Sequence, residues 1–289
     1  MITVILNEFK RQPFLLKQIE HVRNQTVPVE EILIWNNGDG FDGNTLPSGA
    51  EIANSTKNFG VWARFAYALN AQTQYICVLD DDTFPSEGFF ESCLKQMERE
   101  PALLGARGLR FLNHNRYHPF ISFGWDNPNE NTEIVDIVGH AWFFKREWLS
   151  TFWREQPPAK VSRLMGEDIH FSYMMQKYMG IKTMVPPHPK DSQRIWGSCP
   201  EMGLKLGMSN EAISQKEDAL KKFDKTLQRY TALGFKLCID SDGMEEKALV
   251  IGPGLSRVKL LKEFTRKYPR FGTFARFIQS KLIKLNIHI

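Results

Sequence analysis

The amino-acid sequence predicts an α/β fold in which helices flank a mixed, mostly parallel sheet. Short apolar runs that read as strands alternate with helix-like patterns through the first half of the 289-residue chain. The runs are apolar at consecutive positions, which is typical of strands covered on both faces. An apolar fraction of 42% supplies enough side chains for a sizeable core. We therefore expect helices on both faces of the sheet.

The predicted elements of the first half follow this alternation in order. Residues 2–6 form the first strand, and Pro13 lies in the first turn of a helix with apolar residues at helical spacing. Residues 31–35 form the second strand. A helical pattern over residues 62–69 then leads to a third strand at residues 75–79.

The pattern beyond the third strand predicts a mixed extension of the sheet. We expect strands at residues 102–108, 117–123, 132–144 and 181–185, a helix that begins near Gly166, and a polar-faced helix at residues 210–233.

Charge divides the chain into two parts. The net charge is +4, but residues 209–289 hold 16 Lys and Arg against 9 Asp and Glu, so the preceding part is slightly acidic. We predict a catalytic domain at residues 1–208 and a basic, mainly helical extension at residues 209–289. This distribution argues against a general nucleic-acid binder.

The cellular location expected for the protein follows from segments that are not recognisable in the sequence. The four cysteines have no paired spacing, and neither a signal peptide nor an apolar run of membrane-spanning length is recognisable. These features predict a cytoplasmic protein. Residues 255–289 include a basic amphipathic pattern, which predicts either a helix packed on the protein or peripheral contact with an anionic membrane.

Three consecutive aspartates are the strongest functional signal. Asp80, Asp81 and Asp82 directly follow the strand at residues 75–79. Functional groups of α/β sheets collect beyond the carboxyl ends of strands, and three adjacent carboxylates repel one another. A hard divalent cation removes that repulsion. The sequence therefore predicts a site for Mn²⁺ or Mg²⁺ rather than a solvated turn.

A second acidic pair, Glu167-Asp168, follows Gly166 at a predicted helix start. Acids in a first turn are common for electrostatic reasons alone. Together with Asn36 and Asn37 at the second strand end, however, they would place two acidic clusters across one cleft. Sugar transfer from a nucleotide diphosphate needs a cation for the leaving group and a carboxylate at the anomeric carbon.

The sequence resembles glycosyltransferases of the GT-A fold, a Rossmann-like fold, over roughly residues 1–200. The three aspartates are similar to the Asp-x-Asp motif of these enzymes. The resemblance implies that Asp82 binds the metal, that Asp80 lies near the metal or the ribose, and that Asp81 belongs to the donor site. Asn36 and Asn37 match the strand end where these enzymes hold the nucleoside.

Further residues extend the resemblance. Asn58 and Arg64 are similar to an Asn and an Arg of the donor site. Glu167 and Asp168 resemble the acidic pair of the acceptor-facing helix, in which the second acid is the working residue. His188 resembles a late histidine that contacts the metal or the diphosphate in some members.

Two branches of this fold are compatible with the sequence. Gly166–Asp168 resembles the helix start of inverting family 2 enzymes. Trp35–Asn37, Asp80–Thr83 and Gly139–Phe144 resemble the exostosin-like family 64, which is retaining. That family has Asp-Asp-Ile where this chain has Glu-Asp-Ile, and His140 also departs from its pattern. More separate matches favour the exostosin-like branch, and the stereochemical outcome stays open.

These observations predict a metal-dependent glycosyltransferase. The donor is a nucleotide-diphosphate sugar, with a UDP-sugar favoured, and the acceptor is a glycan or a lipid-linked sugar. Arg194 is expected in a loop that closes over the donor, near the diphosphate. Two alternatives stay open: a non-catalytic module that binds glycans or nucleotide sugars, and a metal-dependent phosphohydrolase. A pure binder would not need Asp168.

Overall fold

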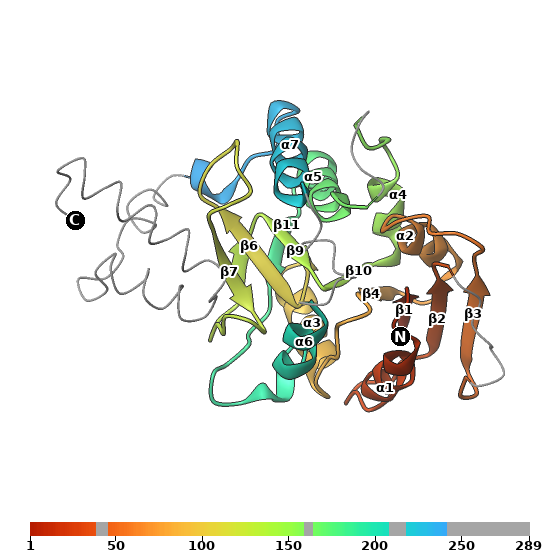
Figure 1. The fold of residues 1–289 in the computed structure, drawn as a ribbon. Coiled ribbons are helices and arrows are strands. Elements are labelled where there is room, and N and C mark those ends of the chain that lie inside the picture. Colours follow the sequence, from red (N-terminus) through yellow and green to blue (C-terminus); the bar gives the residue numbers. More distant parts are fainter. Residues whose placement is uncertain (39–45, 159–163, 208–217, 242–289) are drawn as a thin grey trace, which may run out of the picture. The chain divides into compact units, whose positions relative to one another are not determined.

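The computed structural model describes residues 1–38, 46–158, 164–207 and 218–241 (Figure 1). The strands are β1 (Ile2–Glu8), β2 (Glu31–Asn36), β3 (Ala50–Asn54), β4 (Tyr75–Leu79), β5 (Ala102–Leu104), β6 (Arg107–Phe111), β7 (Phe120–Gly124), β8 (Glu133–Val135), β9 (Ile137–Gly139), β10 (Ala141–Lys145) and β11 (Lys182–Val185). The helices are α1 (Gln12–Arg23), α2 (Ala63–Tyr67), α3 (Phe89–Arg99), α4 (Leu149–Phe152), α5 (Glu167–Met179), α6 (Pro200–Gly207) and α7 (Ala219–Ala232). The 3₁₀ helices are η2 (Ala68–Asn70), η3 (Arg146–Trp148), η4 (Gln193–Ile195) and η6 (Cys238–Asp240).

The described strands form two sheets. The larger has eight strands in the order β3-β2-β1-β4-β10-β5-β11-β8, and the smaller has three in the order β7-β6-β9. β1, β2, β3 and β4 are parallel, and β10 pairs antiparallel with β4. β11 and β5 are again parallel, and β8, the last strand in the order, pairs antiparallel with β11. The predicted mixed, mostly parallel sheet with flanking helices is confirmed.

β4 is the centre of the larger sheet. Ile76, Cys77, Val78 and Leu79 are all fully buried, so helices cover both faces of this strand. Apolar side chains of α1, α3 and α5 belong to the same core cluster as β4. The carboxyl end of β4 therefore lies at a rigid edge of the sheet.

A second core cluster joins the smaller sheet to α5 and α7. Leu109 and Phe111 of β6 pack with Ile169 and Tyr173 of α5 and with Tyr230 of α7. Figure 1 shows α5 and α7 side by side at one end of β6 and β9. The smaller sheet thus reaches the helix that carries the second acidic pair.

Several elements differ from those expected. β3, α3 and α6 were not predicted, and the predicted strand at residues 132–144 is divided into β8, β9 and β10. Two residues at the breaks explain the division. Asp136 turns inward, where its carboxylate accepts bonds from the backbone N–H groups of Phe111 and Cys238. His140 has a left-handed backbone conformation, with φ of 63°.

The chain divides into two compact units, Met1–Asp240 and Ser241–Ile289. α7 therefore belongs to the first unit, although the sequence analysis assigned it to the extension that begins at residue 209. The basic segment at residues 255–289, for which membrane contact was predicted, lies outside the described residues. None of the helices in the described ranges is long and apolar enough to cross a membrane.

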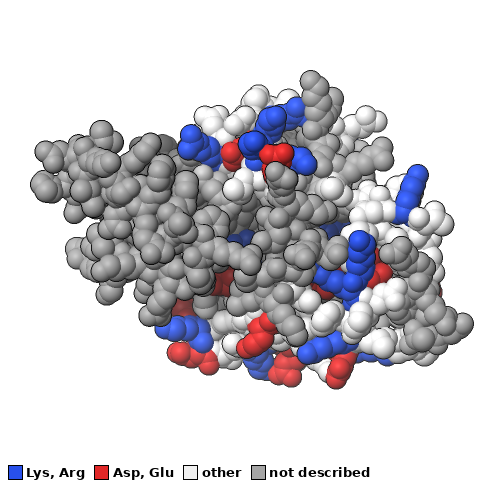
Figure 2. All heavy atoms as spheres, viewed as in Figure 1, with Lys and Arg blue, Asp and Glu red and all other residues white. Residues whose placement is uncertain are grey.

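Charges on the described surface are mixed. Figure 2 shows Lys and Arg interspersed with Asp and Glu along the lower edge of the molecule in that view. Exposed ion pairs such as Lys182–Glu100 and Lys95–Glu91 contribute to this mixture. The excess of basic residues belongs to residues 209–289, of which only 218–241 are described.

Gly105 provides a test of the packing between the two sheets. A Cβ at this position would lie against Val138 of β9 and 2.7 Å from the carbonyl oxygen of Ala141. We expect Gly105→Ala to lower the free energy of unfolding by about 1–3 kcal/mol, because backbone cannot move aside. Gly139→Ala is the matched control, since no described atom lies within 4 Å of its Cβ position. Equal stabilities of the two variants in urea unfolding would contradict this packing.

Candidate active site

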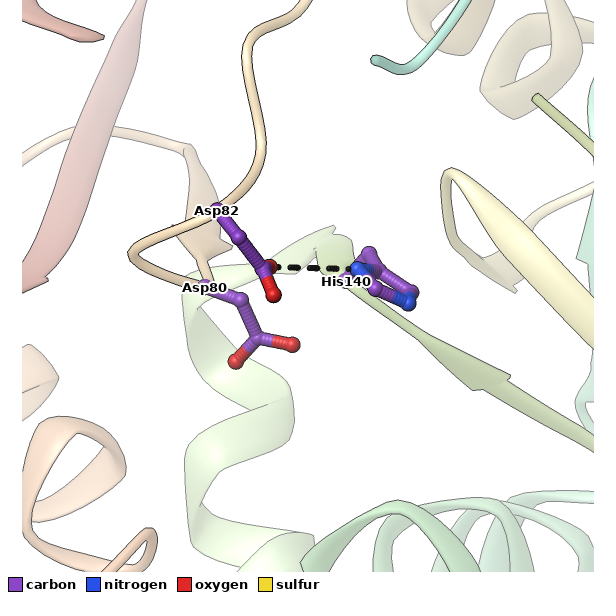
Figure 3. Close-up of side chains that lie close together, drawn as sticks. All are labelled: Asp80, Asp82 and His140. Carbon is purple, nitrogen blue, oxygen red and sulfur yellow. Dashed lines mark hydrogen bonds and ion pairs between the residues drawn. The ribbon is translucent and has the colours of Figure 1, made fainter. Parts of the chain in front are cut away.

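The three aspartates lie at the carboxyl end of β4, beside the start of β10. Ala141 pairs with Leu79 in the antiparallel ladder, so the residue before β10 lies next to the residue after β4. The backbone N–H of Asp80 accordingly donates to the carbonyl oxygen of His140 at 2.9 Å. Figure 3 shows the imidazole of His140 beside Asp82, with Nδ1 of the ring 3.3 Å from Oδ1 of the carboxylate.

Asp80, Asp82 and His140 form a cluster that could hold a metal ion. One ligand atom from each residue lies within 4.8 Å of the other two. Carboxylate oxygens suit Mg²⁺ and Mn²⁺, and an imidazole nitrogen is a better ligand for Mn²⁺ than for Mg²⁺. The donor set therefore fits a divalent cation.

His140 was not expected in this role. Its ring packs edge-to-face on Trp125, with centroids 5.2 Å apart. Burial lowers the pKa of His140, but the hydrogen bond with Asp82 and the charges of Asp82 and Asp80 raise it overall. The same contact, with a further contribution from Arg11, lowers the pKa of Asp82 against the effect of burial. A cation bound here would take the place of the histidine proton.

Two arginines connect the aspartates to other elements. Nη1 of Arg11 lies 2.6 Å from Oδ1 of Asp81 and 3.3 Å from Oδ2 of Asp82. The other terminal nitrogen of Arg11, Nη2, donates to the carbonyl oxygen of Leu206 in α6 at 2.8 Å. Arg11, which follows β1, thereby joins the aspartates to a helix nearly 200 residues away in sequence.

Arg64 of α2 joins the first acidic cluster to the second. Its guanidinium is buried, contacts Asp80, and lies 2.9 Å from Oε1 of Glu167. It also packs over the ring of Trp142, 4.6 Å from the centroid. The side chain of Arg64 therefore bridges the two acidic clusters directly.

The second acidic pair begins α5. Gly166 precedes the helix with φ of 94°, a left-handed conformation that glycine adopts without strain. Glu167 is buried, and Oδ1 of Asp168 accepts from the backbone N–H of Ile169 at 2.7 Å. Burial is the largest cause that raises the pKa of both carboxyls, and their mutual repulsion adds to it for Glu167. The shift is larger for Glu167, so Asp168 ionises first as the pH rises.

The site carries an excess of acidic groups. Two guanidinium groups, Arg11 and Arg64, meet five carboxyl groups, which belong to Asp80, Asp81, Asp82, Glu167 and Asp168. Burial and the charge of Asp82 raise the pKa of Asp81 well above its usual range. A divalent cation would relieve this repulsion.

The predicted nucleoside-binding amides lie at the ends of β2 and β3. Asn36 is buried and donates to Oδ1 of Asn54 at 2.7 Å. Nδ2 of Asn37 donates to Oδ1 of Asn58 at 3.0 Å, and Oδ1 of Asn37 accepts from the N–H of Phe59 at 2.8 Å. Asn37 and Asn58 therefore hold the turn after β2 to the loop before α2. Their contact with a nucleoside stays a prediction.

His188, which was predicted as a metal ligand, is not part of the cluster of Asp80, Asp82 and His140. Nε2 of His188 accepts from the N–H of Gly197 at 2.8 Å, and Nδ1 donates to the carbonyl oxygen of Pro186 at 2.8 Å. Burial lowers the pKa of His188 to about 4. Both ring nitrogens are used, so this neutral histidine fixes the loop at Gly197.

Arg194 lies on the surface. Its side chain is 58% exposed, and Nε donates to Oε1 of Glu87 at 2.7 Å. Among the described residues it makes no ion pair with the three aspartates. Its predicted contact with the diphosphate stays a prediction.

Comparison with known proteins gives a family match. The family described as glycosyl transferase family 2 matches residues 1–153, which is about half of the chain. The match ends before Glu167 and Asp168, and the more specific resemblance to family 64 stays a prediction. No curated protein sequence matches the chain.

Similar solved structures include two of residues 1–349 of S. aureus TarS. The first, in complex with UDP-GlcNAc, has a TM-score of 0.45 and 13% sequence identity, and the match covers 64% of this chain and 56% of that one. The match thus spans just over half of the length of the chain in that structure. The second has a TM-score of 0.44 and 12% identity, with 81% of this chain and 73% of that one covered.

The two histidines provide a matched test of the metal assignment. We expect His140→Ala to weaken Mn²⁺ binding at least about 10-fold, because it removes a ligand atom from the cluster. His188→Ala should leave Mn²⁺ affinity unchanged and lower the free energy of unfolding by about 2–4 kcal/mol, since buried polar groups lose their partners. Calorimetric titration and urea unfolding measure the two effects. Loss of Mn²⁺ affinity in His188→Ala alone would reverse the assignment.

Proposed function

The chain belongs to glycosyl transferase family 2, and we propose that it moves a sugar from a UDP-sugar to a glycan or a lipid-linked acceptor. The observation that carries the proposal is the bridge from Asp80 through Arg64 to Glu167. It brings a cluster suited to a cation and a pair of acids with raised pKa values to one edge of the sheet. These are the two groups that transfer from a nucleotide diphosphate requires.

On this proposal Asp80, Asp82 and His140 hold Mn²⁺ in preference to Mg²⁺. The bound cation would neutralise the charge that gathers on the diphosphate as it leaves. Arg11 supports the cluster because it holds Asp81 and Asp82 in place from the side of β1. We propose that Asn36 and Asn37, at the end of β2, line the nucleoside site, because ligands of α/β sheets bind beyond the carboxyl ends of the strands.

Asp168 is the proposed group at the reacting centre. In an inverting reaction its carboxylate takes the proton of the acceptor hydroxyl, and in a retaining reaction it acts on the anomeric carbon. Both require the ionised form. Glu167 ionises at higher pH and is held by Arg64, so it positions the start of α5 rather than reacting.

Nucleotide binding is the first test of the proposed donor. We expect UDP to raise the melting temperature only when Mn²⁺ is present, because binding to the folded state adds about 2.7 kcal/mol at 100 times the Kd. Asp82→Asn should lose this metal-dependent increase. A panel of nucleoside diphosphates in thermal-shift measurements would identify the base. The absence of a shift with every nucleotide, with and without metal, would overturn the proposal.

The pH profile tests the role of Asp168. Burial is the largest cause that raises the pKa of Asp168, to about 6, and on the proposed function only the ionised carboxylate reacts. We therefore expect kcat/KM for sugar transfer to fall as the pH drops below about 6, whereas an ordinary aspartate titrates at about 3.9. Asp168→Asn should lose at least about 100-fold in kcat while keeping its circular dichroism spectrum. A profile that is flat through this range would contradict the assignment.

A further inference from the structure

Arg107 is the first residue of β6, in the smaller sheet. Its backbone pairs with Gly139, the residue before His140. Nε of Arg107 donates to Oδ2 of Asp126 at 2.7 Å, and the guanidinium packs over the ring of Phe120, 5.5 Å from the centroid. The side chain is 24% exposed. Its two terminal amino groups have no hydrogen-bond partner among the residues that the structure describes.

Two further donors lie near Arg107. Trp125 follows β7, donates its backbone N–H to the carbonyl oxygen of Ala106, and packs its ring on His140. The indole Nε1 is buried and has no partner in the described part of the chain. The hydroxyl of Tyr117, in the connection from β6 to β7, likewise makes no hydrogen bond with any described residue.

The charge of Arg107 acts on two residues near the acidic clusters. Burial and the charge of Asp168 raise the pKa of Tyr117, and the charge of Arg107 opposes them. Arg107 also opposes the rise in the pKa of His140, after the larger effects of burial and of the aspartates. Arg107 is therefore within electrostatic range of a residue of the metal cluster and of a residue beside Asp168.

We propose that Arg107 binds an anionic group, a carboxylate or a phosphate, on a sugar substrate of the proposed reaction. A site rich in carboxylates repels an anionic sugar unless a cation is placed to receive it. Asp126 fixes the guanidinium through Nε, and the two terminal amino groups, which have no partner among the described residues, are available for bidentate recognition of an anion. Tyr117 and Trp125 supply additional donors.

This inference rests on the proposed function and narrows its substrate class. The anionic group belongs either to the donor sugar or to the acceptor sugar, and the two sources are distinguishable by experiment. In both cases the substrate carries a negative charge apart from the diphosphate. Neutral sugars would leave the terminal amino groups of Arg107 without an anionic partner.

Arg110 provides a matched control on the same strand. It also packs on an aromatic ring, that of Phe123 at 4.4 Å, and pairs with Glu133 at 2.6 Å. Residues three apart in a strand point to opposite faces of a sheet, so Arg110 lies on the face away from Arg107. Arg110→Gln therefore removes a similar charge and a similar ring contact without touching the proposed anion site.

The experiment compares neutral and anionic probes in two arms, by calorimetric titration with Mn²⁺ present. The donor arm uses UDP-glucose and UDP-glucuronate, and the acceptor arm adds glucose or glucose 6-phosphate to the protein with UDP. In one arm the natural protein should bind the anionic probe at least about 10-fold more tightly than the neutral one. Arg107→Gln should abolish that preference, Arg107→Lys should keep part of it, and Arg110→Gln should keep all of it.

Three results would overturn the inference. They are the absence of a preference in both arms, a preference that survives in Arg107→Gln, and an equal loss of affinity for UDP itself, which would make the diphosphate the ligand. Melting temperatures without ligand verify that the variants fold. If the natural protein binds none of the nucleotides, the result contradicts the proposed function, on which the inference rests. If it binds them and Arg107→Gln behaves as the natural protein does, only the inference fails.

Discussion

The buried guanidinium of Arg64 is the interaction on which the site depends. It lies between Asp80, which follows β4, and Glu167, which begins α5. The guanidinium also packs over the ring of Trp142. Removal of one partner from a buried ion pair leaves an uncompensated charge and costs about 3–5 kcal/mol. The positions of β4, α2 and α5 are thus tied to one another by charge as well as by packing. This cation stabilises the close approach of the two acids.

The sequence predicted the features that depend on local pattern. The apolar run before Asp80 is a buried strand, and the acids follow it at the sheet edge as expected. β3 was missed because Ala50–Asn54 is half-exposed and lacks an apolar run. Helix α3 was also missed, although its buried residues have helical spacing. The alternation of strands and helices was therefore sufficient for the fold class but not for every element.

The two histidines show why part of the site could not be predicted. His140 reaches the aspartates only because β10 pairs antiparallel with β4, a contact between residues about 60 positions apart. No local pattern carries that information. His188 follows two prolines in a loop and has the residue type of a ligand, but its two ring nitrogens bind backbone groups. Residue type gives the chemistry a side chain can perform, and the strand order decides whether it is near a partner.

The charge balance of the site also constrains how a donor enters. The carboxylates of Asp80 and Asp82 in the metal cluster would repel a diphosphate that arrives without a cation. On the proposed function, the nucleotide and the divalent cation must therefore bind together, or the cation first. Arg11 connects this part of the site to α6. The guanidinium that contacts Asp81 and Asp82 also donates to the carbonyl oxygen of Leu206. One side chain thus contacts both an acid of the metal cluster and the backbone of α6.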